Sequence, residues 1–197
     1  MENMSHMMQF WDERYLHNDT GWDLGTISPP LKAYIDQLRN PSLSILIPGC
    51  GNAYEAEYLL QKGYLDITLA DISPTLVNAL EEKFSTYIGK WVHIHCINFF
   101  ELTGSYDIIL EQTFFCALEP SLRESYVKKM HELLNPGGKL VGLLFNRSFE
   151  TSPPYGGSMD EYIALFSPFF EIKKMVPCGN SATPRQDSEL FFIMEKK

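Results

Sequence analysis

Residues 44–71 constrain the fold more than any other stretch of the chain. An apolar run breaks at Pro48, the glycines Gly49 and Gly51 follow, and after a helical pattern a second apolar run ends in Asp71. This order predicts a strand, a tight turn, a helix and a second strand, the unit from which nucleotide-binding α/β sheets are built. Because glycine carries no Cβ, a ligand can lie against the turn where the helix amides begin.

Asp71 follows Gly51 by twenty residues and lies at the carboxyl end of the expected second strand. Nucleotide-binding folds place an acid there to accept hydrogen bonds from ribose hydroxyls. The alternative is a tight strand-to-helix turn that binds nothing. The dinucleotide fingerprint needs a third glycine at position 54, where this chain has Tyr54. The turn therefore favours a nucleoside without a pyrophosphate, such as S-adenosylmethionine, over NAD.

The length and charge of the chain exclude several classes of protein. Its 197 residues suffice for a single α/β domain, 1–197, and are too few for two of ordinary size. The 16 basic and 25 acidic residues give a formal charge of −9, which disfavours binding to nucleic acid or to an anionic membrane. Because there is neither an apolar run long enough to span a bilayer nor a signal-peptide pattern, we expect a cytoplasmic protein.

No metal centre is expected. The four cysteines are Cys50, Cys96, Cys116 and Cys178. They form no C-x-x-C pair, so they are interpreted as reduced and mostly buried thiols. Packing is favoured over nucleophilic chemistry for Cys50, because the glycine turn needs a small residue there. His93 and His95 would share one face of a strand, but they have no acidic or cysteine partner in reach and are interpreted as structural.

The segment before the first strand is rich in aromatic residues. Residues 1–8 are expected to be disordered, whereas residues 9–27 carry Trp11, Tyr15 and Trp22 in a mostly polar setting. One interpretation is a segment that caps the core with its rings. The other is a lid that closes over a flat or cationic ligand, because a sulfonium is attracted to an aromatic face.

The remaining pattern alternates strands and helices. Helices are expected at residues 29–38, 54–61, 74–84, 121–134 and 158–167. Strands are expected at residues 45–47, 66–70, 91–97, 106–110, 139–145, 169–176 and 189–194. No helical pattern separates the last two strands, so they should pair antiparallel. The prediction is a mixed seven-stranded sheet with helices on both faces, the Rossmann-like layout of class I methyltransferases.

Several motifs resemble the thiopurine/thiol S-methyltransferase branch of the class I S-adenosylmethionine-dependent methyltransferases. The matching pieces are W-x-x-x-Y from Trp11, W-D-x-G from Trp22, I-P-G-C-G from Ile47, D-I-S from Asp71, T-F-F-C-A from Thr113, L-N-P-G-G from Leu134 and P-P-Y from Pro153. They extend over nearly the whole chain. The tryptophan segment and T-F-F-C-A indicate this branch, whereas P-G-G belongs to methyltransferases at large.

The resemblance implies S-adenosylmethionine as the cofactor. The residues implied to bind it are Trp11, Tyr15, Trp22, Pro48, Gly49, Cys50, Gly51, Asp71, Ile72, Asn98, Phe99, Glu111 and Gln112. It places Asp71 on the ribose, Asn98 along the adenine and Gln112 along the methionine part. Family members often carry an acid at position 98 and an Asp-Tyr pair at positions 111 and 112. This chain has Glu111 and Gln112 in place of that pair, and this difference bears on the identity of the acceptor.

The expected reaction transfers a methyl group to a small-molecule acceptor. The cationic sulfur of the donor already activates the methyl group, so the protein chiefly has to align acceptor, methyl and sulfur. A thiol with a pKa near 8.5 is roughly 3% ionised at pH 7 and needs no strong base. Glu111 is the candidate proton acceptor. Phe114, Arg147 and Tyr155 are the candidate residues of the acceptor pocket.

Two other classes of function stay open. A non-catalytic module that holds S-adenosylmethionine or a nucleotide would bind its ligand without turnover. A nucleotide-dependent oxidoreductase is disfavoured by Tyr54. The acceptor itself stays open among a thiol, a thiopurine, a halide, a selenium or tellurium species and an oxygen nucleophile.

Overall fold

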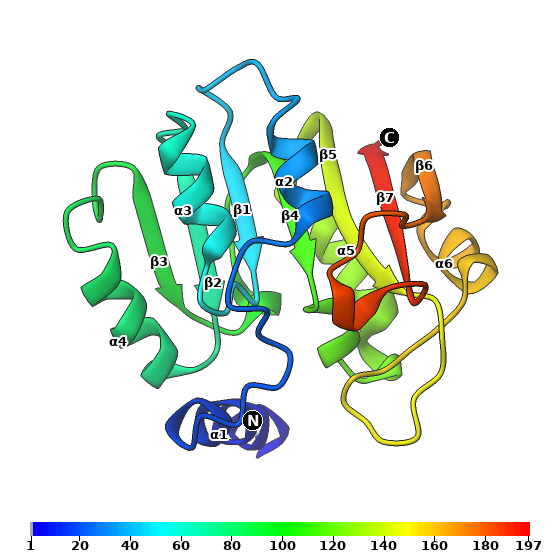
Figure 1. Ribbon diagram of the computed structural model, residues 1–197, viewed down its shortest axis with the longest axis horizontal. Coiled ribbons are helices and arrows are strands. Elements are labelled where there is room, and N and C mark those ends of the chain that lie inside the picture. The colour runs from blue at the N-terminus through cyan, green and yellow to red at the C-terminus, as the bar shows by residue number, and fades with distance from the viewer. Residues whose placement is uncertain (1) are drawn as a thin grey trace.

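The computed structural model describes the backbone of residues 2–197 and the side chains from His6 onward. Its strands form one seven-stranded sheet in the order β3-β2-β1-β4-β5-β7-β6 (Figure 1). The strands are β1 (Ile45–Pro48), β2 (Ile67–Asp71), β3 (Val92–Cys96), β4 (Tyr106–Gln112), β5 (Leu134–Phe145), β6 (Phe170–Pro177) and β7 (Glu189–Lys196). The first five strands run parallel, and β7 pairs antiparallel with β5 and β6. The predicted mixed sheet with its antiparallel C-terminal pair is confirmed.

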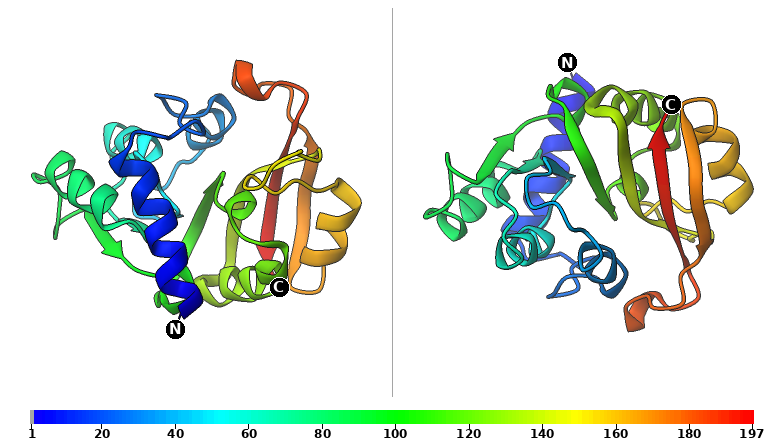
Figure 2. Two further views of the ribbon diagram at one scale, coloured as in Figure 1. Left: turned by 90° about the horizontal axis from the view of Figure 1, so that it is seen from below. Right: turned by 90° about the horizontal axis from the view of Figure 1, so that it is seen from above.

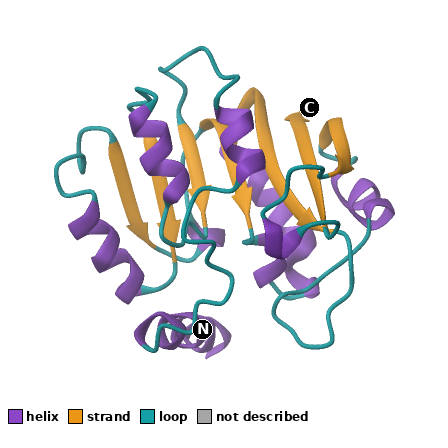
Figure 3. Ribbon diagram, viewed as in Figure 1, coloured by secondary structure: helices purple, strands orange, loops and turns teal. Residues whose placement is uncertain are grey.

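Helices cover both faces of this sheet, as Figure 3 shows. The helices are α1 (Glu2–Leu16), α2 (Pro29–Ile35), α3 (Tyr54–Gln61), α4 (Pro74–Lys83), α5 (Arg123–Leu133) and α6 (Met159–Phe166). Helices α2, α3 and α4 bury Leu31, Leu59 and Leu80 against one face, while α5 and α6 bury Tyr126 and Phe166 against the other. With both faces covered, the edge where the parallel strands end is the place for a ligand.

Strand β1 shows how the sequence specifies a sheet that is buried on both sides. Ile45 and Ile47 belong to the core beneath α2, α3 and α4, and Leu46 belongs to the core beneath α5 and α6. All three side chains are buried. The strand pairs in parallel with β2 and β4. A parallel strand covered on both faces needs a continuous apolar sequence, and this run supplies it.

Most helix starts follow the local signals. Helices α2, α3 and α4 begin at the predicted residues, and the capping box between Ser158 and Glu161 is formed at the start of α6. The helix expected from residue 121 begins only at Arg123, because a 3₁₀ turn at Pro120–Leu122 delays the start of α5. The hydroxyl of Ser121 donates to Glu119 at 3.5 Å.

The N-terminal segment departs from the prediction. Residues 1–8 are expected to be disordered, but α1 begins at Glu2, and only residue 1 lies outside the described backbone. The helix crosses the edge at which the parallel strands end, as the blue ribbon of Figure 2 shows. In the sequence, Met4, Met7, Met8, Trp11 and Tyr15 recur at helical spacing, a signal that the expectation of disorder overlooked.

Candidate active site

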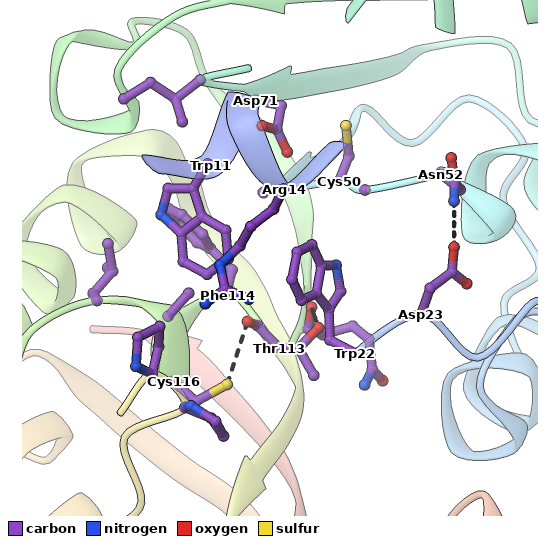
Figure 4. Close-up of a pocket in the computed structure, with 18 of the residues that line it drawn as sticks. Trp11, Arg14, Trp22, Asp23, Cys50, Asn52, Asp71, Thr113, Phe114 and Cys116 are labelled. Carbon is purple, nitrogen blue, oxygen red and sulfur yellow. Dashed lines mark hydrogen bonds between the residues drawn. The ribbon is translucent and has the colours of Figure 1, made fainter. Parts of the chain in front are cut away.

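A cavity of about 480 Å³ opens at the carboxyl ends of the parallel strands (Figure 4). Its walls come from α1 and the loop after it, the glycine turn, the ends of β2, β3 and β4, and the loops beside β5 and β7. The predicted site residues that line it are Trp11, Tyr15, Trp22, Gly49, Cys50, Gly51, Asp71, Ile72, Asn98, Phe99, Gln112, Phe114 and Arg147. Three predicted residues, Pro48, Glu111 and Tyr155, do not line it.

The glycine turn adopts a left-handed backbone conformation, with φ of +55° at Gly49 and +50° at Gly51. Glycine adopts this conformation with the least strain. A Cβ at Gly49 would overlap the ring of Phe114, and a Cβ at Gly51 would stand 3.7 Å from the hydroxyl of Tyr15. The turn therefore lies tightly between the N-terminal segment and the end of β4. Pro48 is buried at the end of β1, behind the turn.

Asp71 is a buried acid at the end of β2. Its Oδ1 accepts a hydrogen bond from the backbone N–H of Ser73 at 3.1 Å. Burial raises the pKa of Asp71 from 3.8 to about 6, while backbone hydrogen bonds from Ser73, Gly51 and Ile72 act in the opposite direction. A desolvated carboxylate is stabilised by further hydrogen-bond donors, and a pair of ribose hydroxyls supplies them.

The aromatic residues of the N-terminal segment form one cluster beside the cavity. The ring centroid of Trp22 lies 5.3 Å from that of Trp11 and 5.8 Å from that of Tyr15, both in edge-on geometry. The guanidinium of Arg14 lies 5.9 Å from the centroids of both indoles, and Figure 4 shows its side chain between them. All four residues line the cavity. The segment thus contributes aromatic rings and a cation to one wall.

Carboxylates fasten the N-terminal segment on two sides of the cavity. Asp12 accepts hydrogen bonds from the hydroxyl of Ser73 at 2.6 Å and from the backbone N–H of Thr75 at 2.8 Å, at the start of α4. Asp23 accepts from the side-chain amide of Asn52 and from the hydroxyl of Tyr54, the latter at 3.2 Å. The segment is therefore joined both to the carboxyl end of β2 and to the glycine turn.

Arg185 provides a third attachment from the loop that precedes β7. Its Nη2 donates to the carbonyl oxygen of Trp22 at 2.5 Å. Its Nη1 lies 3.5 Å from the carboxylate of Glu189, and both side chains are nearly inaccessible to solvent. The segment before α2 and the loop before β7 therefore meet at the cavity.

Asn98 and Phe99 line the cavity after β3. The Oδ1 of Asn98 accepts from the backbone N–H of Phe100 at 3.2 Å and caps the 3₁₀ turn Phe99–Glu101. An amide oxygen has two lone pairs, so one acceptor position remains for a base such as adenine. The ring of Phe99 packs edge-on against Phe114, with 5.1 Å between centroids.

Gln112 ends β4 in the cavity wall. Its amide oxygen and amide nitrogen are both buried, and neither has a hydrogen-bond partner among the described residues. Leaving such a group unpaired costs about 1–3 kcal/mol. An adjacent donor and acceptor suit a ligand that carries both kinds of group, such as the amino-acid end of S-adenosylmethionine. Together with the glycine turn and Asp71, this amide fits that cofactor.

Glu111 does not border the cavity. Its carboxylate is fully buried and accepts hydrogen bonds from the backbone N–H groups of Phe114 and Phe115 and from the hydroxyl of Tyr126. Burial raises its pKa to about 7, although these hydrogen bonds act in the opposite direction. The geometry contradicts both predictions for Glu111, contact with the cofactor and acceptance of a proton from the acceptor, because the carboxylate faces the core.

Tyr155 also departs from the prediction. It lines a neighbouring hollow that shares Arg147, Phe149 and Pro154 with the main cavity. Its backbone N–H donates to the carbonyl oxygen of Cys116 at 2.7 Å, which ties the loop after β5 to the end of β4. The predicted place of its side chain in the main cavity is therefore corrected.

Several charged or polar residues of the cavity were not predicted. Among them are Arg14, Asp19, Asp23, Asn52, Glu55 and Arg185. Arg14 follows Trp11 by one helical turn, so recognition of α1 as a helix would have placed it beside the tryptophan. Asn52 and Glu55 adjoin the glycine turn in sequence, and burial raises the pKa of Glu55. No signal near Arg185 indicates that it contacts the N-terminal segment.

The side chains described from His6 onward contain no group of three or more His, Cys, Asp or Glu residues that could hold a metal ion. The four cysteines are free thiols. His93 and His95 are exposed on the edge strand β3. Within the described part of the chain, every helix is too short or too polar to cross a bilayer.

The strand order, the cavity at the carboxyl edge and the glycine turn with its buried acid define a class I S-adenosylmethionine-dependent methyltransferase. The chain matches the Thiopurine S-methyltransferase (TPMT) family over residues 6–189 and belongs to that family. It is 33% identical over 184 residues to probable thiol methyltransferase 2 of Arabidopsis thaliana, covering 91% of this chain and 81% of that protein. It is 27% identical over 161 residues to thiocyanate methyltransferase 1 of Brassica oleracea, covering 80% and 71% respectively.

A solved structure with the same fold is that of 1,6-didemethyltoxoflavin-N1-methyltransferase from Burkholderia thailandensis, with bound 1,6-didemethyltoxoflavin and S-adenosylhomocysteine. The TM-score is 0.81 at 17% sequence identity, over 100% of this chain and 89% of that one. The likeness concerns the fold. With the family match, the predicted fold class, family and cofactor are confirmed, and the chain is an S-adenosylmethionine-dependent methyltransferase.

Proposed function

We propose that this methyltransferase acts on a small sulfur nucleophile, in the first place a thiol. The observation that carries the proposal is the uneven distribution of ionisable groups around the cavity. The carboxylates that border it are Asp19, Asp23, Glu55 and Asp71. The described lining residues from position 97 onward include no Asp, Glu, His or Lys, and their two cations are Arg147 and Arg185.

This distribution determines which acceptors the cavity suits. The glycine turn, Asp71, the N-terminal segment, Asn98, Phe99 and Gln112 would hold the cofactor, which leaves the half lined by residues 113–188 for the acceptor. That half offers no carboxylate or imidazole to remove a proton. A thiol of pKa near 8.5 ionises without such a base, and neighbouring guanidinium groups favour the thiolate. Phe114 and Phe149 add apolar surface that suits a polarisable nucleophile.

S-Adenosylmethionine, when bound, supplies a methyl group that its cationic sulfur already activates. The task of the protein is then to orient the reactants and to exclude water. Asp71 would accept from the ribose hydroxyls, and the amide of Gln112 would pair with the amino-acid group. Residues 9–27 would form the lid of the single domain 1–197 and supply the rings of Trp11 and Trp22, whose faces attract a cation.

A small sulfur anion such as thiocyanate is a second acceptor class. The guanidinium of Arg147 favours it, since this side chain lies over the ring of Phe149 at 4.8 Å and is exposed beside the cavity. An anion needs no deprotonation, so its rate should be flat with pH where the rate with a thiol rises. The Brassica oleracea relative is named for thiocyanate.

Formation of S-adenosylhomocysteine tests the proposal. The protein is incubated with S-adenosylmethionine and, separately, an alkyl thiol, an aromatic thiol, thiocyanate, a catechol and an amine. We expect turnover with sulfur acceptors, and a rate that rises with pH toward the pKa of each thiol. Turnover with the catechol or the amine alone would overturn the sulfur assignment. Cofactor binding without turnover of any acceptor would identify a non-catalytic binding module.

The cytoplasm is the proposed location. The free thiols of Cys50, Cys96, Cys116 and Cys178 support a reducing compartment. The formal charge of −9 supports small-molecule acceptors over nucleic acid or an anionic membrane surface. A fusion to a fluorescent protein, imaged in cells together with a compartment marker, checks the location.

A further inference from the structure

The buried carboxylate of Glu111 uses both of its oxygens within the protein. Oε1 accepts from the backbone N–H groups of Phe114 at 2.8 Å and Phe115 at 3.0 Å, and Oε2 accepts from the hydroxyl of Tyr126 at 2.5 Å. The neighbouring strand β5 pairs Gly142 with Glu111, and a Cβ at Gly142 would overlap the backbone of Glu111. A side chain at position 142 would therefore press on β4 at the residue from which this acid projects.

The two amides that Glu111 binds belong to a strained turn. Thr113 has a φ of +61°, a conformation that is unusual for a β-branched residue and persists only where the surroundings hold it. The hydroxyl of Thr113 donates to the carbonyl oxygen of Gln112 at 2.6 Å, and the thiol of Cys116 donates to the carbonyl oxygen of Thr113 at 3.3 Å. These contacts are local, whereas Glu111 links the turn to Tyr126 of α5.

The turn supplies the part of the wall that lies between the two halves of the cavity. Gln112, Phe114 and Cys116 line the cavity, and Figure 4 shows Thr113, Phe114 and Cys116 together at this wall. The ring of Phe114 packs so closely on the glycine turn that Gly49 has no room for a Cβ. A shift of this turn would therefore displace groups beside the cofactor site and the acceptor site at once.

We propose that Glu111 is a positioning residue for methyl transfer. Through the amides of Phe114 and Phe115 it fixes the turn, and through Phe114 and Cys116 it sets the alignment of the acceptor with the methyl group. The inference rests on the proposed function. It assigns Glu111 no proton transfer, because both carboxylate oxygens are engaged inside the core.

Two substitutions of nearly equal volume separate positioning from proton transfer. Glu111→Gln keeps an oxygen for the two amides, whereas Glu111→Met removes it. With a thiol acceptor, we expect kcat within about threefold of the wild type for Glu111→Gln and lowered about 10- to 100-fold for Glu111→Met, because small misplacements cost large rate factors. The dissociation constant of S-adenosylhomocysteine should stay within about threefold of the wild type in Glu111→Gln and should rise in Glu111→Met, because Phe114 of the turn packs on the glycine turn. Tyr162→Phe removes a buried hydroxyl that donates to the carbonyl oxygen of Phe145, and it is the control for the loss of a buried hydrogen bond that does not involve Glu111.

A second measurement follows the turn itself and needs no acceptor. The labelling rate of each cysteine with a thiol reagent is measured by peptide mass spectrometry. Cys116 should react faster in Glu111→Met than in the wild type and Glu111→Gln, because the turn opens more often. Cys178, which is also buried and lies outside the cavity lining, should react at the same rate in all three proteins.

The outcomes separate the inference from the proposed function. Equal losses of kcat in Glu111→Gln and Glu111→Met would overturn positioning and restore a proton-accepting role. Unchanged kcat and unchanged Cys116 labelling in Glu111→Met would show that the carboxylate does not hold the turn.

If the wild type methylates no acceptor, the proposed function fails, and the labelling still decides the inference. If Glu111→Met does not fold, Gly142→Ala replaces it, because the added Cβ presses on Glu111. Wild-type kinetics and wild-type Cys116 labelling in Gly142→Ala would overturn the inference.

Discussion

Asp12 and Ser73 are joined by a hydrogen bond of 2.6 Å although they lie 61 positions apart in the chain. Ser73 also accepts from the backbone N–H of Leu76 at 3.1 Å, as the N-cap of α4, and its own backbone N–H donates to Asp71. Asp12 adds a second cap by accepting from Thr75 at 2.8 Å. One serine therefore connects the proposed ribose acid with the N-terminal segment, so the docking of that segment and the binding of a ribose should be coupled.

The first prediction concerns Asp12. Asp12→Ala removes a capping interaction worth about 0.5–2 kcal/mol, so docking of the segment weakens and the affinity for S-adenosylhomocysteine should fall about 2- to 30-fold. Isothermal titration calorimetry measures this change. Glu13→Ala, on the exposed side of the same helix, is the matched control and should bind like the wild type. Equal affinities for both variants would show that the segment and the cofactor site are independent.

The second prediction concerns Asp71 as the ribose acceptor. Removing a charged acceptor costs about 1.5–3 kcal/mol, so Asp71→Ala should weaken S-adenosylhomocysteine binding roughly 10- to 100-fold. Asp66→Ala removes an exposed carboxylate just before β2 and should leave affinity unchanged. Circular dichroism confirms that both variants are folded. Wild-type affinity in folded Asp71→Ala would place the ribose elsewhere.

The third prediction follows from the raised pKa of Asp71, about 6 in the folded protein against 3.8 ordinarily. Between these values the folded state holds a proton that the unfolded state has released, so this group lowers stability as the pH rises from 3.8 to 6. Ribose hydroxyls donate to the ionised form, so cofactor affinity should do the opposite, rising with pH up to about 6 and then levelling off. Titrations of S-adenosylhomocysteine between pH 5 and 8 test this, and Asp71→Asn should lose the dependence below 6.

Short-range patterns predicted the parts of this protein that are decided within a few residues. The continuous apolar run from Ile45 to Ile47 suits a strand buried on both sides. Within a helix, Pro29 is tolerated only in the first turn, so it marks where α2 begins. The turn with Gly49 and the acid at the end of β2 follow from local chain geometry in the same way. Their positions in the cavity therefore required no knowledge of distant contacts.

The errors concern side chains whose roles depend on distant partners. Glu111 lies near the carboxyl end of β4, where a ligand-binding acid is expected. Successive residues of a strand point to opposite faces, however, and the hydroxyl of Tyr126 in α5 holds the carboxylate of Glu111 in the core. Arg185 meets Trp22 across 163 positions, which no local pattern encodes. Helix α1 was missed although Met7, Met8, Trp11 and Tyr15 recur at helical spacing. Its place over the cavity depends on tertiary contacts such as that of Asp12 with Ser73, which no local pattern shows.

The last prediction concerns residues 9–27 as a lid. Ordering backbone costs roughly 1–2 kcal/mol per residue, and the fixed attachments of this segment are Asp12, Asp23 and the carbonyl of Trp22. A bound cofactor adds ring contacts worth about 2 kcal/mol each when a desolvated cation meets an aromatic face. Amide hydrogens of residues 9–22 should therefore exchange more slowly with S-adenosylhomocysteine bound than without it, as hydrogen-exchange mass spectrometry measures.

Substitutions distinguish this lid from a fixed cap of the core. Trp11→Ala and Trp22→Ala should weaken cofactor affinity without lowering the melting temperature of the free protein, because both rings border the cavity and belong to neither buried core cluster. Phe10→Ala, whose ring is 40% exposed and does not line the cavity, is the matched control and should bind like the wild type. A fixed cap would instead lower the melting temperature of the free protein when either tryptophan is removed. It would also protect residues 9–22 equally with and without ligand, and that result would end the lid hypothesis.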